Sequence, residues 1–347
     1  MPVSSGVPWG VRSQNLFKCS RRHALKAGLL AGAGMALAVR LTEAGESAPL
    51  ITKPIPSSGE RLPVIGLGTI WFRNAQYEQL RAVLKRMSEL GGTLIDTAAA
   101  YGESEGVIGR ALSELEIRRK MFVATKFDAG GMRPPGPPTG TAPNPLPGPP
   151  PGIERPVADG VGGEDSFERS LVRFHSRQID LLQVHGLNGT DTLLPLMQHW
   201  KQAGRIRYIG ATTSNPQQHP ELMAAMRRYP LDFIQVDYSI EDRGAADEVF
   251  PLAIERKVAV LVNLPLGRAR LIAKAGSTPL PPWAAEIGIV SWSQFLLKYV
   301  VSHPAVTCAI PGATQVKHLE DNQAAGRGRL PDATDRRKME QFWTSIA

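Results

Sequence analysis

Short apolar runs alternate with helical segments along most of this 347-residue chain, and this alternation constrains the fold most strongly. Continuous apolar runs of this length are typical of strands buried on both faces of a parallel sheet. Eight of them begin near Val64, Thr93, Phe122, Ile179, Ile206, Leu231, Val258 and Val306. Apolar residues at three-to-four spacing predict helices near residues 76–90, 166–174, 193–203, 246–257 and 291–301. Eight repeats of strand then helix close into a barrel of about 250 residues, so the sequence predicts an α/β fold, a (β/α)8 TIM barrel.

An open, doubly wound sheet is the rival architecture. It would normally carry a glycine-rich phosphate-binding turn. The sequence contains neither a G-x-G-x-x-G pattern nor a P-loop, which favours the barrel. It also contains no H-E-x-x-H or paired-cysteine motif, so no metal site is predicted. Before the first barrel strand, residues 57–60 separate two short extended pieces and predict a hairpin.

The first 38 residues have the layout of an export signal. They contain five basic residues and no acidic one, and they include most of an apolar, Gly- and Ala-rich run from Ala27 to Val39. The pair Arg21-Arg22 makes the segment resemble a twin-arginine signal, which implies export by the Tat machinery and a periplasmic or otherwise exported protein. The apolar run is shorter than the ~20 residues of a membrane span, so no stable membrane anchor is expected. A disordered basic tail is the alternative.

Composition divides the rest of the chain. We expect a linker at 39–49, a barrel at 50–330 and a C-terminal helix or tail at 331–347, with a proline-rich loop insertion at 133–156 that is either a lid or disordered.

Removing the five basic residues of the signal from the formal net charge of +8 leaves +3, which is too little to argue for a nucleic-acid partner. Cys308 lies in an apolar run, where a small buried hydrophobe is expected rather than a nucleophile.

Four polar residues come at or just after the ends of three successive predicted strands. Asp96 and Tyr101 follow the second run, Lys126 ends the third and His185 ends the fourth. Active sites of parallel barrels lie at the carboxyl ends of the strands. Each residue alone has an ordinary structural explanation, such as a helix cap or a surface charge. Their joint placement predicts one catalytic site.

These residue types suit the addition of hydride to a carbonyl group. A tyrosine donates a proton poorly near neutral pH unless a neighbouring cation lowers its pKa. Lys126 is expected to be that cation, held in place by Asp96. His185 is expected to hydrogen-bond the carbonyl oxygen and stabilise the charge that develops there, and Tyr101 is then the proton donor.

The motifs around these residues resemble those of the aldo-keto reductase family, from about Pro54 to about Ala325. Seven segments follow in the order of the family: Gly66-Leu67-Gly68-Thr69-Ile70-Trp71, Asp96-Thr97-Ala98-Ala99-Ala100-Tyr101-Gly102, the strand that ends at Lys126, Val184-His185, Gly204-Arg205-Ile206-Arg207-Tyr208-Ile209-Gly210, Gln235-Val236 and Ile310-Pro311-Gly312. The resemblance implies a TIM barrel, a nicotinamide cofactor, a small-molecule carbonyl substrate and a catalytic tetrad of Asp96, Tyr101, Lys126 and His185.

The resemblance also implies where the nicotinamide would lie. Gly68, Thr69, Thr212 and Thr213 are expected near it, and Gln235 at its carboxamide. Asn263 stands where many members have an aromatic residue that stacks on the nicotinamide ring. The other implied cofactor-binding positions are Leu264, Gly267, Gly312, Ala313, Thr314, His318, Asp321 and Asn322.

The type of coenzyme depends on two of these positions. Gly312 and His318 stand where many family members have a lysine and an arginine that hold the 2′-phosphate. NADPH is expected on family grounds, and NADH stays open. Trp71 is expected in the substrate pocket, whereas Trp283 is expected to pack in the core.

Two other functions stay open. A weakly catalytic or non-catalytic nicotinamide-binding sensor on the same barrel would fit the export signal, because the space outside the cytoplasm has no obvious NADPH supply. A lyase in which Lys126 forms a Schiff base is less favoured, because it would need neither Tyr101 nor Gln235. Four further histidines, His175, His199, His219 and His303, are expected to be solvated.

Overall fold

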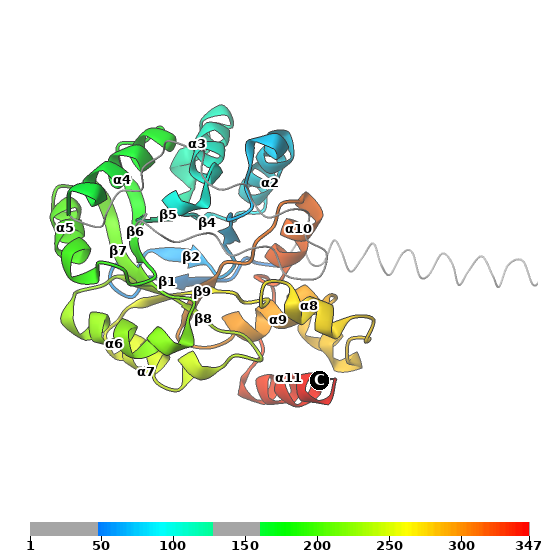
Figure 1. The fold of residues 1–347 in the computed structure, drawn as a ribbon. Coiled ribbons are helices and arrows are strands. Elements are labelled where there is room, and N and C mark those ends of the chain that lie inside the picture. Colours follow the sequence, from blue (N-terminus) through cyan, green and yellow to red (C-terminus); the bar gives the residue numbers. More distant parts are fainter. Residues whose placement is uncertain (1–47, 128–159, 347) are drawn as a thin grey trace, which may run out of the picture. The chain divides into compact units, whose positions relative to one another are not determined.

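A parallel sheet of eight strands forms the centre of the fold (Figure 1). The strands are β3 (Leu67–Gly68), β4 (Leu94–Asp96), β5 (Phe122–Lys126), β6 (Ile179–His185), β7 (Ile206–Thr212), β8 (Phe233–Asp237), β9 (Ala259–Asn263) and β10 (Val306–Ala309). Each strand pairs with its neighbour in the chain. Isolated parallel bridges from Ile65 to Ala309 and from Gly68 to Gly312 close the sheet on itself. The predicted (β/α)8 barrel is confirmed.

This computed structural model describes residues 48–127 and 160–346. The predicted export signal at 1–38 and the proline-rich insertion at 133–156 lie outside the described residues. The predictions made for these two segments therefore stay predictions.

Helices surround the barrel (Figure 1). They are α2 (Tyr77–Glu89), α3 (Ser104–Glu114), α4 (Gly160–Arg173), α5 (Thr190–Gln202), α6 (His219–Arg228), α7 (Val249–Glu255), α8 (Arg270–Ala275), α9 (Trp292–Val301), α10 (Val316–Ala324) and α11 (Ala333–Ser345). The helix predicted at 246–257 is shorter than expected. It begins at Val249, so that Pro251 falls in the first turn, where its missing N–H breaks no helical hydrogen bond.

Two apolar layers hold the barrel together. The outward side chains of the strands, such as Ile95, Val123 and Leu182, pack beneath the helices. The inward side chains form a second cluster that includes Phe122, Phe233 and Cys308. Cys308 is fully buried there and burial raises the pKa of its thiol, which confirms that it is a small core residue rather than a nucleophile.

The predicted hairpin is present, and it closes the amino-terminal end of the barrel. Its strands are β1 (Thr52–Pro54) and β2 (Arg61–Pro63), and Ile55 and Leu62 pack into the inner apolar cluster. The N-terminal face of such barrels serves stability rather than catalysis. The hairpin therefore acts as a plug at the end opposite the expected active site.

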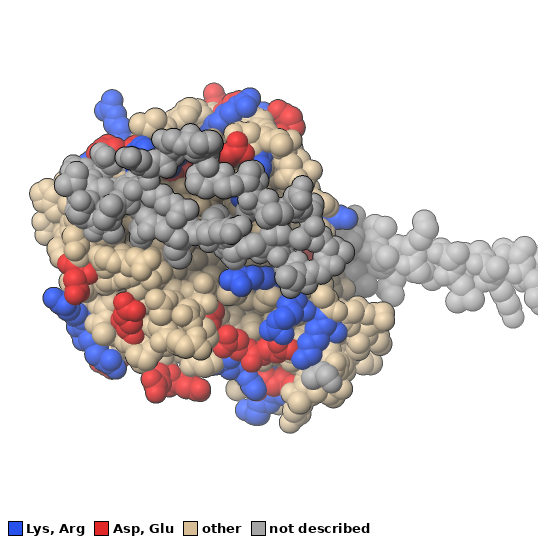
Figure 2. All heavy atoms as spheres, viewed as in Figure 1, with Lys and Arg blue, Asp and Glu red and all other residues tan. Residues whose placement is uncertain are grey.

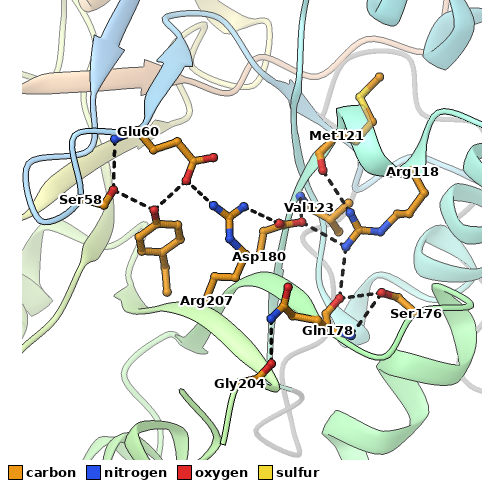
Figure 3. Close-up of polar contacts among 11 residues, drawn as sticks. Ser58, Glu60, Arg118, Met121, Val123, Ser176, Gln178, Asp180, Gly204 and Arg207 are labelled. Carbon is orange, nitrogen blue, oxygen red and sulfur yellow. Dashed lines mark hydrogen bonds and ion pairs between the residues drawn. The ribbon is translucent and has the colours of Figure 1, made fainter. Parts of the chain in front are cut away.

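A polar network fixes this hairpin to the barrel wall (Figure 3). At its centre, Asp180 accepts hydrogen bonds from the backbone N–H of Val123 at 2.9 Å and from Arg207 at 2.8 Å. Arg207 also pairs with Glu60 of the hairpin, whose carboxylate accepts a hydrogen bond from the Tyr208 hydroxyl at 2.7 Å. The carboxylate of Asp180 is thus satisfied on both oxygens, as a largely buried charge requires.

The residues predicted as a C-terminal helix or tail contain a helix that packs on the barrel. A capping box at Asp332 and Asp335 begins α11, and Met339 and Trp343 are buried in the core. Trp283 packs against Phe295 at a centroid distance of 6.1 Å, as expected for a core aromatic residue. Within residues 48–127 and 160–346, no helix is long and apolar enough to cross a membrane.

Acidic and basic side chains are interspersed on the face drawn in Figure 2. Ion pairs between charged side chains also join separate elements of the described residues. Glu241, which follows β8, pairs with both Arg270 and Lys274 of α8, and Arg243 pairs with Glu340 of α11 at 2.8 Å. These ion pairs join loops at the ends of the strands to the outer helices.

Candidate active site

The strand pattern brings Asp96, Lys126 and His185 to one end of the barrel interior. Side chains of a strand alternate between its two faces, and the inward residues Leu94, Ala124 and Leu181 belong to the inner cluster. Counting in steps of two from these residues leads to Asp96, Lys126 and His185. Each lies at the carboxyl end of its strand.

Lys126 and Asp96 form a buried ion pair. The Lys126 Nζ lies 2.6 Å from Asp96 Oδ2 and donates a second hydrogen bond to the Thr97 carbonyl at 2.8 Å. Burial lowers the pKa of Lys126, but the charge of Asp96 and the contact with Tyr101 outweigh it, so the pKa is raised. Burial raises the pKa of Asp96 against the opposing charge of Lys126. The lysine is therefore held as an ammonium.

Tyr101 lies beside this pair. It ends η2 (Ala99–Tyr101), a short 3-10 helix after β4, and the Lys126 Nζ is 5.1 Å from the centre of its ring. Burial raises the pKa of the Tyr101 hydroxyl, and Lys126 opposes this rise without cancelling it. The expectation that Lys126 brings this pKa below its ordinary value is wrong for the protein without ligand, because loss of solvation outweighs the cation. The hydroxyl therefore keeps its proton.

His185 completes the group. Its ring meets the Tyr101 ring edge-on, with centroids 5.8 Å apart. Burial, and then the charge of Lys126, lower the pKa of His185 to about 3. The imidazole is neutral near pH 7 and carries one N–H donor and one acceptor nitrogen. The structure thus brings all four predicted tetrad residues together.

Hydroxyl groups brace the loop that carries Tyr101. The Thr69 hydroxyl donates to the carbonyl of Asp96 at 2.9 Å, and the Ser104 hydroxyl donates to the carbonyl of Thr69 at 3.0 Å. The Thr97 hydroxyl donates to that of Ser104 at 2.9 Å. Thr69 was predicted near a nicotinamide, and it does lie at the tetrad. Its hydroxyl already binds the protein, so its clearest role is structural.

Gln235 and Asn263 present acceptor atoms at the same end of the barrel. The Gln235 Nε2 lies 3.4 Å from Asp96 Oδ2, while its Oε1 is buried and unpartnered among the described residues. The Asn263 Nδ2 donates to the Thr213 carbonyl at 2.9 Å, and its Oδ1 is likewise buried without a partner in the described part of the chain. Buried acceptors without donors are costly. They match the amide N–H groups of a nicotinamide carboxamide.

The comparison with family models agrees with this geometry. The model of the aldo/keto reductase family matches residues 64–334. The chain belongs to the aldo/keto reductase family. The match covers all eight barrel strands and all four tetrad residues.

Curated relatives agree with this family, and a solved structure shows the same fold. The chain is 28% identical over 293 residues to methylglyoxal reductase YeaE of Escherichia coli, covering 81% of this chain and 92% of that protein. It is 27% identical over 315 residues to the NADP(+)-designated aldo-keto reductase yakc of Schizosaccharomyces pombe, covering 79% and 87%. An aldo-keto reductase structure from Klebsiella pneumoniae in complex with NADPH superposes with a TM-score of 0.66 at 24% identity, covering 85% and 96%, and shows the same fold.

The positions predicted for the rest of the coenzyme lie around β9, β10 and α10. Leu264 and Gly267 adopt positive φ angles of 51° and 55° in the turn after β9. Gly312 and His318 are exposed, Thr314 is half-buried, and Ala313 and Asn322 are buried. Thr212 is buried at the end of β7, opposite Gln235 in the sheet register. These placements are compatible with the family pattern, and the roles themselves stay predictions.

Asp321 has a structural explanation of its own. Its Oδ2 accepts a hydrogen bond from the Ser291 hydroxyl and its Oδ1 one from the Gln294 side chain, both at 2.8 Å. Ser291 is the N-cap of α9. Both carboxylate oxygens of Asp321 therefore help to fix the start of that helix, and a contact with adenine would have to share them.

Sequence reasoning missed several polar residues near the site. Gln183 is fully buried two residues before His185, and strand alternation places both on one face. The spacing of two residues from His185 could have predicted that Gln183 lies on the same face of the strand. The pair of His219 and Asp237, 3.3 Å apart, had no such signal, because it joins the start of α6 to the end of β8.

Two of the histidines differ from the prediction of solvated side chains. His219 is 8% exposed. His303 is half-buried, and its ring centre lies 4.8 Å from that of Phe250. His219 begins α6 and contacts Asp237 at the end of β8, and His303 follows α9 and packs against α7. Within residues 48–127 and 160–346, no group of three or more His, Cys, Asp or Glu side chains is arranged to hold a metal ion.

Proposed function

We propose that this aldo/keto reductase reduces aldehyde or ketone carbonyls to alcohols with a nicotinamide coenzyme, preferably NADPH. One observation carries the proposal. The Lys126 ammonium, 2.6 Å from Asp96, lies 5.1 Å from the centre of the Tyr101 ring, whose edge meets the neutral ring of His185. This arrangement presents a proton donor, a cation and a neutral hydrogen-bond donor at one point.

Each residue has a distinct role in the proposed reaction. NADPH, when bound, supplies a hydride to the carbonyl carbon. Tyr101 transfers its hydroxyl proton to the carbonyl oxygen, and Lys126 stabilises the phenolate that remains. His185 donates a hydrogen bond to the same oxygen as negative charge develops there. Asp96 keeps Lys126 charged in a site where an isolated ammonium would lose its proton.

The residues present fit a nicotinamide coenzyme. The unpartnered oxygens of Gln235 and Asn263 are acceptors for the carboxamide N–H groups. The name of the yakc relative carries NADP(+), which supports NADPH for this chain. Gly312 and His318 offer less positive charge to a 2′-phosphate than a lysine and an arginine would, so we expect appreciable use of NADH as well.

The two alternatives differ in what they need from the site. A Schiff-base lyase requires a neutral amine, and the raised pKa of Lys126 disfavours it. A nicotinamide-binding sensor would need the coenzyme subsite without turnover. The joint presence of all four tetrad groups favours the enzyme over the sensor.

Coenzyme oxidation by the purified protein tests the proposal. Small aldehydes and ketones, including methylglyoxal, are assayed with NADPH and with NADH. Tyr101→Phe should remove most of the turnover and keep coenzyme affinity. Tyr229→Phe is the matched control, because it removes a hydroxyl that binds Asp191 outside the barrel, and it should retain activity. Tight coenzyme binding without turnover on any carbonyl would favour the sensor, and an active Tyr101→Phe would remove this tyrosine from the mechanism.

We also propose that residues 1–38 direct export by the Tat machinery. The support is the basic start, the Arg21-Arg22 pair and the short apolar run. A reporter protein fused to these residues should leave the cytoplasm of a bacterial host, and Arg21→Lys with Arg22→Lys should block its export. A reporter retained in the cytoplasm would support the disordered basic tail instead.

A further inference from the structure

Two loops meet beside the proposed proton donor. The first runs from β3 to α2 and contains Trp71, and the second runs from β4 to α3 and contains Tyr101. On the inner side, the hydroxyls of Thr69, Thr97 and Ser104 join these loops, as described above. On the outer side, a different set of contacts joins them.

Arg73 makes the central contact of this outer set. Its Nη1 shares its two N–H groups among three carbonyl oxygens, those of Phe72 at 2.7 Å, Ile70 at 2.9 Å and Tyr101 at 3.2 Å. The side chain is half-buried. One guanidinium nitrogen thus ties the backbone of the proton donor to the loop on either side of Trp71.

A second clasp lies next to the first. The Glu103 carboxylate accepts hydrogen bonds from the backbone N–H of Asn74 at 3.0 Å and from the Asn74 side chain at 2.8 Å. Glu103 is the N-cap of α3 and lies two residues after Tyr101. Asn74 follows Arg73 directly in the chain. The contact of Asn74 with Glu103 therefore joins the same two loops a second time. Gly102, between Tyr101 and Glu103 in the chain, has a φ of 66°. Few residues other than glycine adopt this backbone conformation.

We propose that Arg73 is a positioning residue for the reduction, acting on Tyr101 through its carbonyl. This inference rests on the proposed function. The Tyr101 hydroxyl must stay within hydrogen-bond reach of the carbonyl oxygen while His185 approaches the same oxygen. η2 is a three-residue element whose C-cap is a glycine, so it fixes little by itself. Arg73 adds a restraint to that of the hydroxyl network, and it couples the position of Tyr101 to the backbone on either side of Trp71.

The test compares three variants by steady-state kinetics. Arg73→Met removes the donor and keeps an unbranched side chain. Arg73→Lys keeps a cation that can donate to the same carbonyls. Arg61→Met is the matched control, because Arg61 also binds a carbonyl, that of Thr52, but in the hairpin at the opposite end of the barrel. Coenzyme affinity and thermal unfolding are measured for every variant.

We expect Arg73→Met to lower kcat about 10- to 100-fold, since a displacement of about 1 Å costs this much in rate. Coenzyme affinity should stay within about twofold. The deuterium isotope effect with 4-deuterated NADPH should rise, because the chemical step becomes rate-limiting. Arg73→Lys should recover part of kcat, and Arg61→Met should leave kcat and the isotope effect unchanged.

Three results would overturn the inference. They are a folded Arg73→Met with the kcat of the wild type, a loss of kcat that Arg61→Met shares, or a loss explained by weaker coenzyme binding with no change in isotope effect. If Arg73→Met does not fold, Arg73→Gln, which keeps a polar side chain without the guanidinium, takes its place, and a wild-type kcat and isotope effect in that variant would overturn the inference. A wild-type protein without turnover on any carbonyl would instead overturn the proposed function and this inference with it, and the wild-type assay alone identifies that case.

Discussion

The Lys126 ammonium and the Asp96 carboxylate lie 2.6 Å apart inside the barrel, with 1% and 3% of their side chains exposed. Taking both charges out of water is expensive, and their mutual attraction repays that cost only when further hydrogen bonds satisfy them. The Thr97 carbonyl accepts a hydrogen bond from the ammonium, and the Gln235 Nε2 lies 3.4 Å from Asp96 Oδ2, whereas Asp96 Oδ1 has no partner among the described residues. Removing either partner would therefore leave the other charge buried and uncompensated.

Asp96→Asn should destabilise the protein and inactivate it. The substitution keeps the shape of the side chain but leaves the buried Lys126 ammonium uncompensated, which typically costs about 3–5 kcal/mol. Urea unfolding measures the change. The control is Asp191→Asn, which breaks an exposed pair with Arg228 and should cost at most about 1 kcal/mol. Equal effects of the two variants would contradict the role assigned to the buried pair.

The two directions of the reaction should respond differently to pH. Because the pKa of Tyr101 is raised and that of His185 is about 3, carbonyl reduction should vary little between about pH 5 and pH 8. Alcohol oxidation needs the Tyr101 phenolate as base, so its rate should climb with pH and not level off below the ordinary tyrosine pKa of about 10. Initial rates in both directions measure this. A plateau of oxidation near neutral pH would show that coenzyme or substrate lowers the pKa of Tyr101.

Acid should destabilise the fold through His303. Burial lowers its pKa to about 4, and the nearby Arg336 and Lys53 add to the effect. Its Nδ1 accepts a hydrogen bond from the Ala305 N–H at 3.2 Å, which protonation of that nitrogen would break. The ordinary pKa of histidine is about 6.5. The folded protein then holds fewer protons than the unfolded chain between about pH 4 and pH 6.5, so the free energy of unfolding falls as pH falls through this window.

Urea unfolding at a series of pH values checks this sign. His303→Gln should be less stable at pH 7 and should lose less stability on acidification than the wild type. His199→Gln, at an exposed position of α5, is the matched substitution. A slope unchanged in His303→Gln would show that other groups, such as His185, account for the acid sensitivity.

Lys53→Met should loosen the plug at the amino-terminal end of the barrel. The Lys53 Nζ donates to the carbonyls of Val301 at 2.8 Å, His303 at 2.9 Å and Val306 at 2.6 Å. Leaving such carbonyls without donors should cost about 2–3 kcal/mol, measured by chemical unfolding. Lys85→Met removes a lysine of α2 that is 59% exposed and pairs with Glu89, and should cost about 0.5 kcal/mol or less. A similar loss in both would contradict the stabilising role assigned to the Lys53 hydrogen bonds.

The sequence by itself determined the barrel and the positions of the four candidate catalytic residues. Continuous apolar runs separated by amphipathic helices are local patterns, and eight of them leave few architectures. Because the carboxyl ends of parallel strands meet at one rim of a barrel, the residues at the ends of β4, β5 and β6 could be expected to lie together. Asp96, Lys126 and His185 were found in this way, and Tyr101 through the motif that follows β4.

Only the tertiary structure decided how these groups are tuned and held. The raised pKa of Tyr101 depends on how much water the folded loops exclude, which no residue pattern encodes. Arg73 binds the carbonyl of Tyr101 across 28 residues, and Lys53 binds that of Val301 across 248. The local sequences around His303 and His219 did not predict that these side chains would be packed in the folded protein. Such contacts join residues that are far apart in the chain, and the local sequence of one does not predict the other. The solvation of a side chain depends on all of its neighbours in the folded protein.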